Sequence, residues 1–184
     1  VSTDDFVLLS VGELSPRKNH EVVIRAMSVL KNNDKLNKLE YVICGRGNYE
    51  TELRKIAQDL NVIEHVHFLG FRADIAEICN CADLFIFMSH QEGLPVALME
   101  AMACGLPAVC SDIRGNTDLI ENQKTGLIAD NTPEAVAKAI ETMCLDSNLR
   151  RRLSLGALEK IKQFDLSSIE NTMKYIYIEI AENK

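Results

Sequence analysis

Short apolar runs alternate with segments of helical periodicity along most of this 184-residue chain, and this alternation limits the fold more than any other feature. Each run is apolar at nearly every position, as is typical of a strand that is buried on both faces of a parallel sheet. Parallel neighbours need a crossover, which the helical segments can supply. The pattern predicts an α/β fold with a doubly wound, six-stranded parallel sheet. The predicted strands are Phe6–Val11, Leu39–Cys44, His65–Leu69, Ala82–Met88, Pro107–Cys110 and Gly126–Ile128.

The segments between these runs have apolar residues on one face and polar residues on the other, which predicts amphipathic helices. These helices are expected at Asn19–Leu30, Tyr49–Leu60, Ala73–Asn80 and Val96–Ala103.

The end of the chain is also helical. Thr132 is a suitable N-cap, and Pro133 suits the first position of the helix that follows. Two more helices are predicted, at Leu149–Phe164 and Ser167–Glu182. The last one has a broad apolar surface, which we expect to dock on something that this chain does not contain. No linker interrupts the sequence, so one Rossmann-like domain is predicted over residues 1–184, with a helical extension from about residue 147.

The composition excludes several classes of protein. A net charge of −7 leaves no basic excess to displace counterions from a nucleic acid. No apolar run approaches the roughly 20 residues that span a bilayer, and no secretory signal is found at the start. The first residue is Val1 and not Met, which favours a fragment or a processed chain. The six cysteines form no Cys-x-x-Cys pair, so reduced thiols are expected.

Ligands of doubly wound sheets bind outside the carboxyl ends of the strands. In this sequence those ends are the three glycines Gly12, Gly45 and Gly70 and the loops at 89–92 and 111–115. We therefore expect a ligand site where these segments meet.

The segment from Ser89 to Cys110, SHQEGLPVALMEAMACGLPAVC, contains two carboxylates of interest. Glu100 lies in an apolar helix, so it is expected to be paired, hydrogen-bonded or protonated. A purely structural alternative is that it caps a neighbouring loop or meets Lys18. Glu92 precedes Gly93-Leu94-Pro95, and Pro95 is expected at the first helical position, where the helix start would direct free amides at an anion.

This segment resembles the E-x7-E signature of GT-B glycosyltransferases, specifically the large retaining family 4, with Glu92 and Glu100 at the two acidic positions. The resemblance extends over nearly the whole chain as an ordered set of motifs. They are Val11-Gly12, Lys18, Cys44–Gly47, Val66–Phe71, Ala82–Phe85, Gly105–Val109, Ser111-Asp112 and Asn122–Ile128. The run Ser111–Asn116 is most similar to enzymes that build bacterial capsule or exopolysaccharide.

The resemblance covers one half of such an enzyme. These proteins have two Rossmann-like domains, and this chain is similar to the carboxy-terminal one, which binds the nucleotide-sugar donor. The amino-terminal acceptor domain is then absent from the chain. In the family the last helix crosses back to that domain, which fits its apolar surface here.

The resemblance also implies roles for individual residues. Glu92 and Lys18 are the implied catalytic residues: Glu92 holds the hydroxyls of the donor sugar, and Lys18 neutralises the diphosphate. Glu100 binds the ribose, the amides of Gly93 and Leu94 assist Glu92, and the base lies against the loop from Gly70 to Arg72. The full set of implied donor-binding residues is Gly12, Lys18, Arg46, Phe71, Glu92, Gly93, Leu94, Pro95 and Glu100. No metal ligands and no cofactor are expected.

One position departs from the family pattern. Many members have Arg directly after the first glycine, where this chain has Glu13. The positive charge must then come from Lys18, with Arg17, Arg46 or Arg114 nearby, so the phosphate site is either rewired or weaker.

Three other features of the sequence are weaker candidates for a functional site. Gly45-Arg46-Gly47 lacks the third glycine of a dinucleotide fingerprint. His65 and His67 share one strand face, but without a third ligand a rim or packing role is favoured over a metal. His90 is interpreted either as part of the sugar pocket or as an ordinary loop residue.

The sequence thus predicts the donor-binding domain of a retaining glycosyltransferase. It would move a hexose or N-acetylhexosamine from a nucleotide-diphosphate sugar to a glycan or lipid-linked acceptor, and would be inactive in transfer alone. The alternatives are a non-catalytic nucleotide-sugar-binding subunit of a two-chain transferase and a GT-B epimerase acting on UDP-sugars. The expected location is the cytoplasm or the inner face of the membrane, with any membrane contact assigned to the amino-terminal half.

Overall fold

The computed structural model describes residues 2, 4–32 and 38–182, so the chain start at Val1 lies outside the described part. A six-stranded sheet forms its centre, with the strand order β3-β2-β1-β4-β5-β6, and every neighbouring pair is parallel. The doubly wound parallel sheet predicted from the apolar runs is therefore confirmed. The strands are β1 Phe6–Val11, β2 Leu39–Cys44, β3 Val66–Gly70, β4 Leu84–Phe87, β5 Ala108–Ser111 and β6 Leu127–Ala129.

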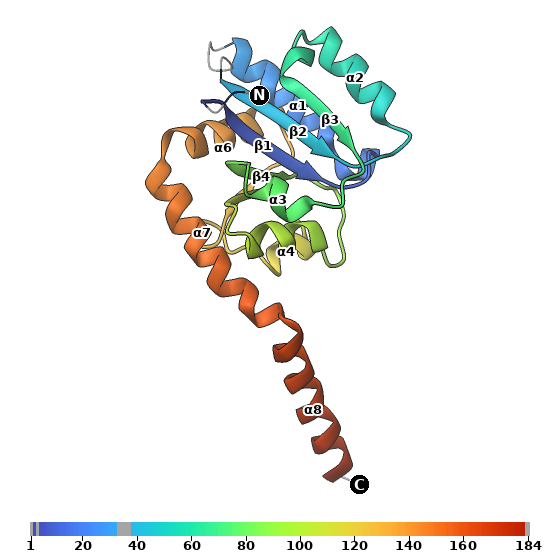
Figure 1. Cartoon of the computed structure of the whole chain (residues 1–184), viewed down its shortest axis with the longest axis vertical. Coiled ribbons are helices and arrows are strands. Elements are labelled where there is room, and N and C mark those ends of the chain that lie inside the picture. The colour runs from blue at the N-terminus through green and yellow to red at the C-terminus, as the bar shows by residue number, and fades with distance from the viewer. Residues whose placement is uncertain (1, 3, 33–37, 183–184) are drawn as a thin grey trace.

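Helices cover both faces of this sheet (Figure 1). Side chains alternate between the faces of a strand, and two separate apolar clusters result. One contains Leu8 of β1 and packs on α1, α2 and α6, whereas the other contains Leu9 and packs on α3 and α4. Both leucines are fully buried. The helices are α1 His20–Asn32, α2 Glu50–Asp59, α3 Ile75–Cys79, α4 Val96–Ala103, α5 Arg114–Thr117, α6 Pro133–Leu145, α7 Ser147–Ile161 and α8 Leu166–Glu182, with short 3-10 turns at Pro16–Lys18, Ile63–His65 and Lys162–Phe164.

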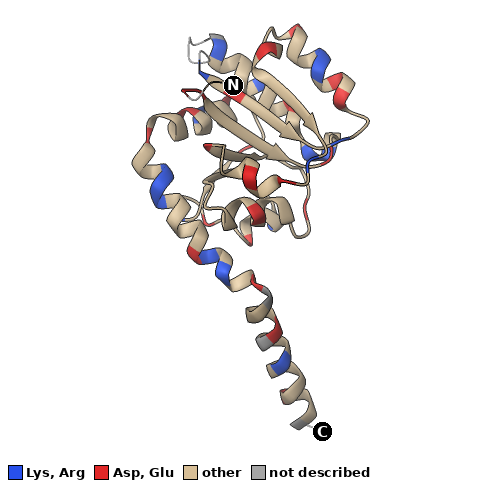
Figure 2. Ribbon diagram, viewed as in Figure 1, with Lys and Arg blue, Asp and Glu red and all other residues tan. Residues whose placement is uncertain are grey.

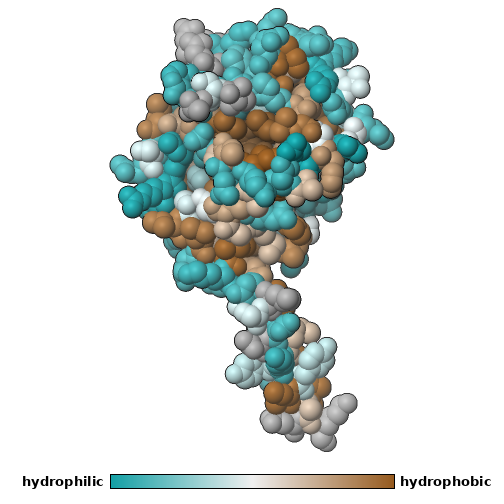
Figure 3. All heavy atoms as spheres, viewed as in Figure 1, coloured by the Kyte–Doolittle hydropathy of each residue, from teal (hydrophilic) through white to brown (hydrophobic). Residues whose placement is uncertain are grey.

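Charge is nearly absent from the visible strands and is concentrated on the helices and loops (Figure 2). Because α3 is short, it covers the sheet only in part. A cavity of about 350 Å³ opens beside it and is visible as an apolar hollow near the centre of the face in Figure 3. Its apolar lining includes Val7, Leu9, Val42, Leu69 and Ile78.

The start of α6, which comes directly after β6, forms as the sequence predicts. Pro133 is in the first turn, and the hydroxyl of Thr132 accepts a hydrogen bond from the amide of Ala135 at 3.3 Å. The next helix, α7, starts two residues earlier than predicted because the carboxylate of Asp146 accepts from the amide of Leu149 at 2.8 Å and caps the helix.

Other boundaries differ from the predictions for physical reasons. The strand predicted over Ala82–Met88 is shorter and covers Leu84–Phe87, because its neighbours β1 and β5 pair with these residues. Helix α5 was not predicted, since its four residues are too few to show a helical period.

The last helix, α8, extends away from the body of the molecule (Figure 1). Its apolar side chains are exposed, with Tyr175 at 75% and Tyr177 at 66%. The other exposed apolar members are Ile169, Met173, Ile176, Ile178 and Ile180. Among the described helices, none combines the length and the apolar character that crossing a membrane requires.

Candidate functional site

The two predicted catalytic side chains meet at the carboxyl ends of the strands. Lys18 follows β1 and Glu92 follows β4, and these neighbouring strands lie where the order of the sheet reverses, which is where ligands bind. The Nζ atom of Lys18 lies 2.6 Å from Oε1 of Glu92. The two side chains are only 12% and 8% exposed, and Nζ also lies 4.8 Å from the centre of the Phe87 ring. The pair is thus a largely desolvated charge pair with a strong electrostatic interaction.

Arg17 connects the two loops that carry this pair. Its Nη1 atom donates to the carbonyl of Gln91 at 2.9 Å and lies 3.5 Å from Oε1 of Glu92. In return, the amide of His90 donates to the carbonyl of Arg17 at 2.8 Å. The sequence suggested Arg17 only as a nearby positive charge, whereas the structure shows that it also positions Glu92. His90 contributes here through its backbone, and its residue is exposed.

The carboxylate of Glu13, the departure from the family pattern, pairs with Arg17 and not with Lys18. Its side chain is 61% exposed, and its carboxylate lies 3.9 Å from Nη2 of Arg17. The Lys18 charge is therefore matched by Glu92 and not by Glu13. Arg114, another predicted source of positive charge, is exposed on α5.

The expectation that Glu100 lies in apolar surroundings is wrong. Glu100 is exposed on α4, because the face of this helix that packs on the sheet consists of Leu98, Ala101 and Met102. Its carboxylate forms no hydrogen bond or ion pair within the described part of the chain, and the alternative contact with Lys18 is not made. The carboxylate is consequently accessible to a ligand.

The start of α4 lies beside Glu92. Pro95 is the N-cap and not the first helical residue, one position from the prediction. No acceptor in the described ranges takes a hydrogen bond from the amides of Gly93 and Leu94. A Cβ atom added at Gly93 would meet nothing within 4 Å, so internal packing does not require a glycine there. Free amides beside a helix start suit an anionic or polar ligand.

A cavity of about 400 Å³ lies at the ends of β1, β2 and β3, beside the pair. Gly12, Arg46 and Phe71, three of the predicted donor-binding residues, all line it. The guanidinium of Arg46 lies 6.0 Å from the centre of the Phe71 ring, which is 68% exposed. A flat guanidinium and an aromatic ring at the mouth of a cavity are suited to stacking on a planar ligand group.

The loop that carries Glu92 packs on the loop at 111–115, which the sequence placed at the same strand ends without giving its residues individual roles. A Cβ atom added at Gly115 would lie 2.7 Å from the carbonyl oxygen of Glu92, so no side chain fits there. Ser111 donates from its hydroxyl to the carbonyl of Ser89 at 2.6 Å, and Asn116 donates to the same hydroxyl at 3.0 Å. The sequence signals for this support were the position of 111–115 at a strand end and the family resemblance of the run from Ser111 to Asn116.

The neighbouring loop after β2 shows the same close packing. A Cβ atom added at Gly45 would lie 1.8 Å from the carbonyl oxygen of Gly12, and one at Gly47 would lie 2.1 Å from that of Leu14. These two glycines therefore allow the loop after β1 to contact the loop after β2 directly.

The other groups singled out in the sequence lie apart from the pair. His65 and His67 both bind the carboxylate of Glu40, at 3.0 and 2.6 Å. Within the described ranges, no three His, Cys, Asp or Glu side chains gather as metal ligands would. All six cysteines are free thiols.

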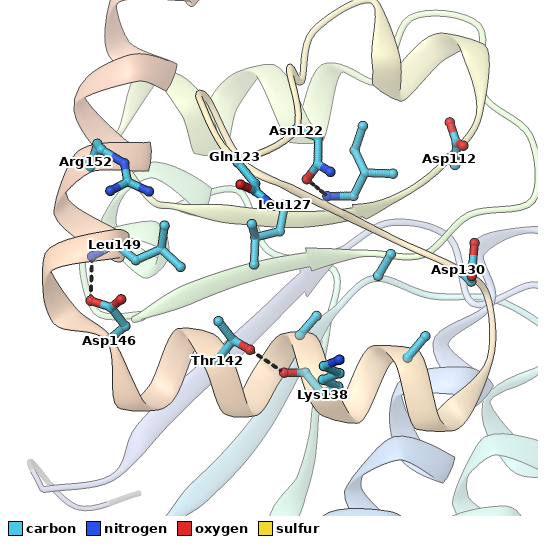
Figure 4. A pocket seen from close by; sticks show the side chains of 14 residues that line it. Asp112, Asn122, Gln123, Leu127, Asp130, Lys138, Thr142, Asp146, Leu149 and Arg152 are labelled. Carbon is cyan, nitrogen blue, oxygen red and sulfur yellow. Dashed lines mark hydrogen bonds between the residues drawn. The ribbon is translucent and has the colours of Figure 1, made fainter.

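A third, more polar cavity of about 720 Å³ lies along the edge strand β6, between it and the helices α6 and α7 (Figure 4). Lys138 and Arg152 come from the helices, and Asn122 comes from the loop before β6. The side chain of Asn122 accepts from the amide of Ile128 at 3.0 Å, so it satisfies a donor of the edge strand. None of the predicted donor-binding residues lines this cavity.

Sheet order and site together define a Rossmann-like nucleotide-binding domain of the kind that forms one half of a GT-B fold. The chain belongs to the family of glycosyl transferases group 1, whose sequence profile matches residues 1–160.

Its relatives include transferases that act on lipid-linked sugars. It is 30% identical over 184 residues to the UDP-Gal:alpha-D-GlcNAc-diphosphoundecaprenol alpha-1,3-galactosyltransferase of Escherichia coli, with 98% of this chain and 47% of that protein covered. It is 32% identical over 179 residues to the N-acetylgalactosamine-N,N'-diacetylbacillosaminyl-diphospho-undecaprenol 4-alpha-N-acetylgalactosaminyltransferase of Campylobacter jejuni, with 96% and 48% covered. The chain thus spans about half the length of the curated relatives it matches.

The chain also spans about half the length of the solved structures that it resembles. Anabaena HepE in complex with UDP-glucose is similar with a TM-score of 0.87 and 25% identity, over 96% of this chain and 49% of that chain. A glycosyltransferase from Rickettsia africae shares the fold with a TM-score of 0.88 at 21% identity, over 98% of this chain and 49% of that chain. The predicted membership in a GT-B glycosyltransferase family is therefore confirmed.

Proposed function

We propose that this chain is the donor-binding half of a retaining glycosyltransferase that takes a hexose or an N-acetylhexosamine from a UDP-sugar. The observation that carries the proposal is the Lys18–Glu92 pair beside the free amides of Gly93 and Leu94. It brings a cation, an anion and neutral donors together where a charged diphosphate and a polyhydroxyl sugar must lie side by side. The choice of UDP follows from HepE, which is named in complex with UDP-glucose.

In the proposed bound state, Lys18 exchanges its partner. The lysine ammonium turns to the diphosphate, while the Glu92 carboxylate accepts hydrogen bonds from hydroxyls of the donor sugar, with Arg17 holding it in place. When the bond between the sugar and the diphosphate breaks, the leaving diphosphate gains negative charge, which Lys18 and the amides stabilise without a bound metal.

The rest of the donor follows from the surrounding residues. The exposed carboxylate of Glu100 accepts hydrogen bonds from the two ribose hydroxyls. The base enters the cavity of about 400 Å³ and stacks near Phe71 and Arg46. Gly12 and Pro95 complete the set through their backbones.

We also propose that the chain, as a single domain, works with a second half that carries the acceptor site. The exposed apolar side chains of α8 would pack against that half, since they find no cover on this one. Because the named relatives act on undecaprenol-linked sugars, the acceptor is proposed to be lipid-linked and the location to be the inner face of the membrane.

Isothermal titration of this chain with UDP, GDP and ADP tests the donor site. We expect UDP to bind best, and Glu100→Ala to weaken UDP binding by roughly tenfold, about 1.4 kcal/mol, without changing the melting temperature. Glu170→Ala on α8 is the matched control, because it removes another exposed helical carboxylate far from the site. Equal UDP affinity in both variants would contradict the role of Glu100, and binding of none of the nucleotides would contradict an independent donor site.

A further inference from the structure

The carboxylate of Glu92 has one close cationic partner in the described part of the chain. Its Oε1 atom lies 2.6 Å from Nζ of Lys18 and 3.5 Å from Nη1 of Arg17. That Nη1 atom already donates to the carbonyl of Gln91 at 2.9 Å. Within the described ranges, Oε2 of Glu92 accepts no hydrogen bond. Because only 8% of the Glu92 side chain is exposed, water does little for this charge, and Lys18 is the group that chiefly balances it.

The ammonium of Lys18 is enclosed. Its side chain is 12% exposed, and Nζ lies between the carboxylate of Glu92 and the ring of Phe87, whose centre is 4.8 Å away. The aliphatic part of the side chain runs along the strand end, since a Cβ atom added at Gly12 would lie 3.4 Å from its Cε atom. To bind an anion in the cleft, the ammonium must therefore turn away from Glu92.

This turn has a different cost for two kinds of ligand. UDP offers a diphosphate to Lys18 but no group to Glu92. The carboxylate is then left largely buried beside a second anion, with only the distant contact to Arg17, and removing the partner of a buried charge is costly. A UDP-sugar also brings hydroxyl groups, which can donate to the carboxylate in strong, charge-assisted hydrogen bonds.

We propose that Glu92 is a specificity-determining residue that acts against nucleoside diphosphates without a sugar: it weakens the binding of UDP and strengthens that of UDP-sugars. The inference rests on the proposed function, because it takes Lys18 as the diphosphate ligand and Glu92 as the sugar ligand. It has a consequence for turnover. Once the sugar is transferred, the remaining UDP leaves Glu92 without a partner, and the return of Lys18 to Glu92 favours the release of UDP.

Two substitutions of Glu92 and one of Glu13 separate this exchange from general electrostatics. Glu92→Gln removes the charge and keeps the shape. Glu92→Met has a similar length and no hydrogen-bonding nitrogen, so it excludes a new bond to phosphate and provides a second variant if the first does not fold. Glu13→Gln is the matched control: it removes one negative charge from the loop after β1, where the side chain is 61% exposed and pairs with Arg17.

The first readout is the affinity for UDP, UDP-glucose, UDP-galactose and UDP-N-acetylglucosamine, measured by isothermal titration. We expect both Glu92 variants to bind UDP about tenfold more tightly than the unsubstituted chain. The UDP-sugar that the unsubstituted chain binds best should be bound less tightly by both. Glu13→Gln should change the affinities for all four ligands by the same factor, below about threefold, as for an exposed charge.

The second readout is the rate at which UDP dissociates, measured by stopped-flow displacement. Because differences in affinity at one site are mostly differences in the dissociation rate, we expect UDP to leave both Glu92 variants about tenfold more slowly. The rate for Glu13→Gln should stay within about threefold of that for the unsubstituted chain.

The outcomes separate the failure of this inference from the failure of the proposed function. If the unsubstituted chain binds UDP and both Glu92 variants bind it equally well or more weakly, the donor site stands and the inference is overturned. It is also overturned if Glu13→Gln gains as much UDP affinity as the Glu92 variants, or if these variants gain equally for UDP and the UDP-sugars. Binding of none of the four ligands to the unsubstituted chain would instead refute the proposed function.

Discussion

The cleft at the strand ends and the helix α8 differ in whether their side chains find partners within the described part of the chain. In the cleft, the charged side chains of Lys18 and Glu92 are almost buried and paired at 2.6 Å. On α8, apolar side chains such as Tyr175 and Tyr177 are in solvent at 75% and 66% exposure. The first region satisfies its groups within the chain, and the second leaves them for another surface. The contrast indicates that the charged pair finds its partners within this chain, whereas the described part of the chain provides no cover for the apolar side chains of α8.

The largest effect is expected from breaking the pair in the cleft. Among the described residues, Lys18→Met leaves the buried Glu92 with Arg17 as its one cationic partner, so we expect the free energy of unfolding to fall by close to the roughly 3–5 kcal/mol of a broken buried ion pair. UDP binding should be lost in the same variant. Urea unfolding measures the first effect and titration calorimetry the second.

The double variant Lys18→Met/Glu92→Gln sharpens this result. Removing both charges should restore most of the stability, while UDP binding stays absent. A double variant as unstable as the single one would show that the charge pair is not the source of the loss.

A smaller effect on the stability of the fold is expected from pH, through the imidazole of His20, which is buried beneath the cleft. Because burial lowers the pKa of His20 to about 4, the unfolded chain binds the proton more readily. Stability due to neutral His20 is present above the usual pKa near 6.5 and is lost as pH falls toward 4, by at most about 1.4 kcal/mol per pH unit. Unfolding from pH 7 to 4, compared between the unsubstituted chain and His20→Gln, isolates this contribution from that of the carboxylates. Identical pH profiles would mean that His20 titrates normally.

Arg17 should matter less than Lys18, because its side chain is 45% exposed. Arg17→Gln is expected to lower stability by less than about 1 kcal/mol, as is usual for exposed ion pairs. Its effect on UDP affinity should be a few-fold, since it only steadies the Glu92 loop. A loss of binding as complete as that of Lys18→Met would instead make Arg17 a direct phosphate ligand.

The smallest effect on folding is expected on α8. Replacing Ile176 and Ile180 by Ser should change the free energy of unfolding by no more than about 0.5 kcal/mol, as for other exposed positions. Leu153→Ser on α7 is the contrasting control, since that side chain is fully buried. Light scattering should show less self-association in the α8 variant. If the variant is as unstable as the control, α8 packs on the domain and the contrast between the two regions is wrong.

The sheet and part of the site could be predicted because both follow from short-range patterns. Apolar runs identified each strand, the family resemblance named Lys18 and Glu92, and the ends of neighbouring parallel strands explain why the two meet at one edge. Glu100 was placed wrongly because an apolar helix does not reveal which of its faces packs on the sheet. Arg17 was expected only as a nearby charge and Gly115 only as part of a strand-end loop, and the contacts by which Arg17, Gly115 and Asn116 support the Glu92 loop were not predicted, since each joins two loops that are far apart in sequence.

The glycines that allow these loops to touch have a further consequence for ligand binding. Atoms at Gly45, Gly47 and Gly115 sit so close to carbonyl oxygens that no larger residue fits, and the loops are therefore fixed when the chain folds. The ordering entropy of the cleft is spent before a donor arrives, which leaves more of the interaction energy for affinity. Lys18 is the exception: its flexible side chain is held by the ion pair with Glu92, so it can turn to a bound anion while the loops keep their positions.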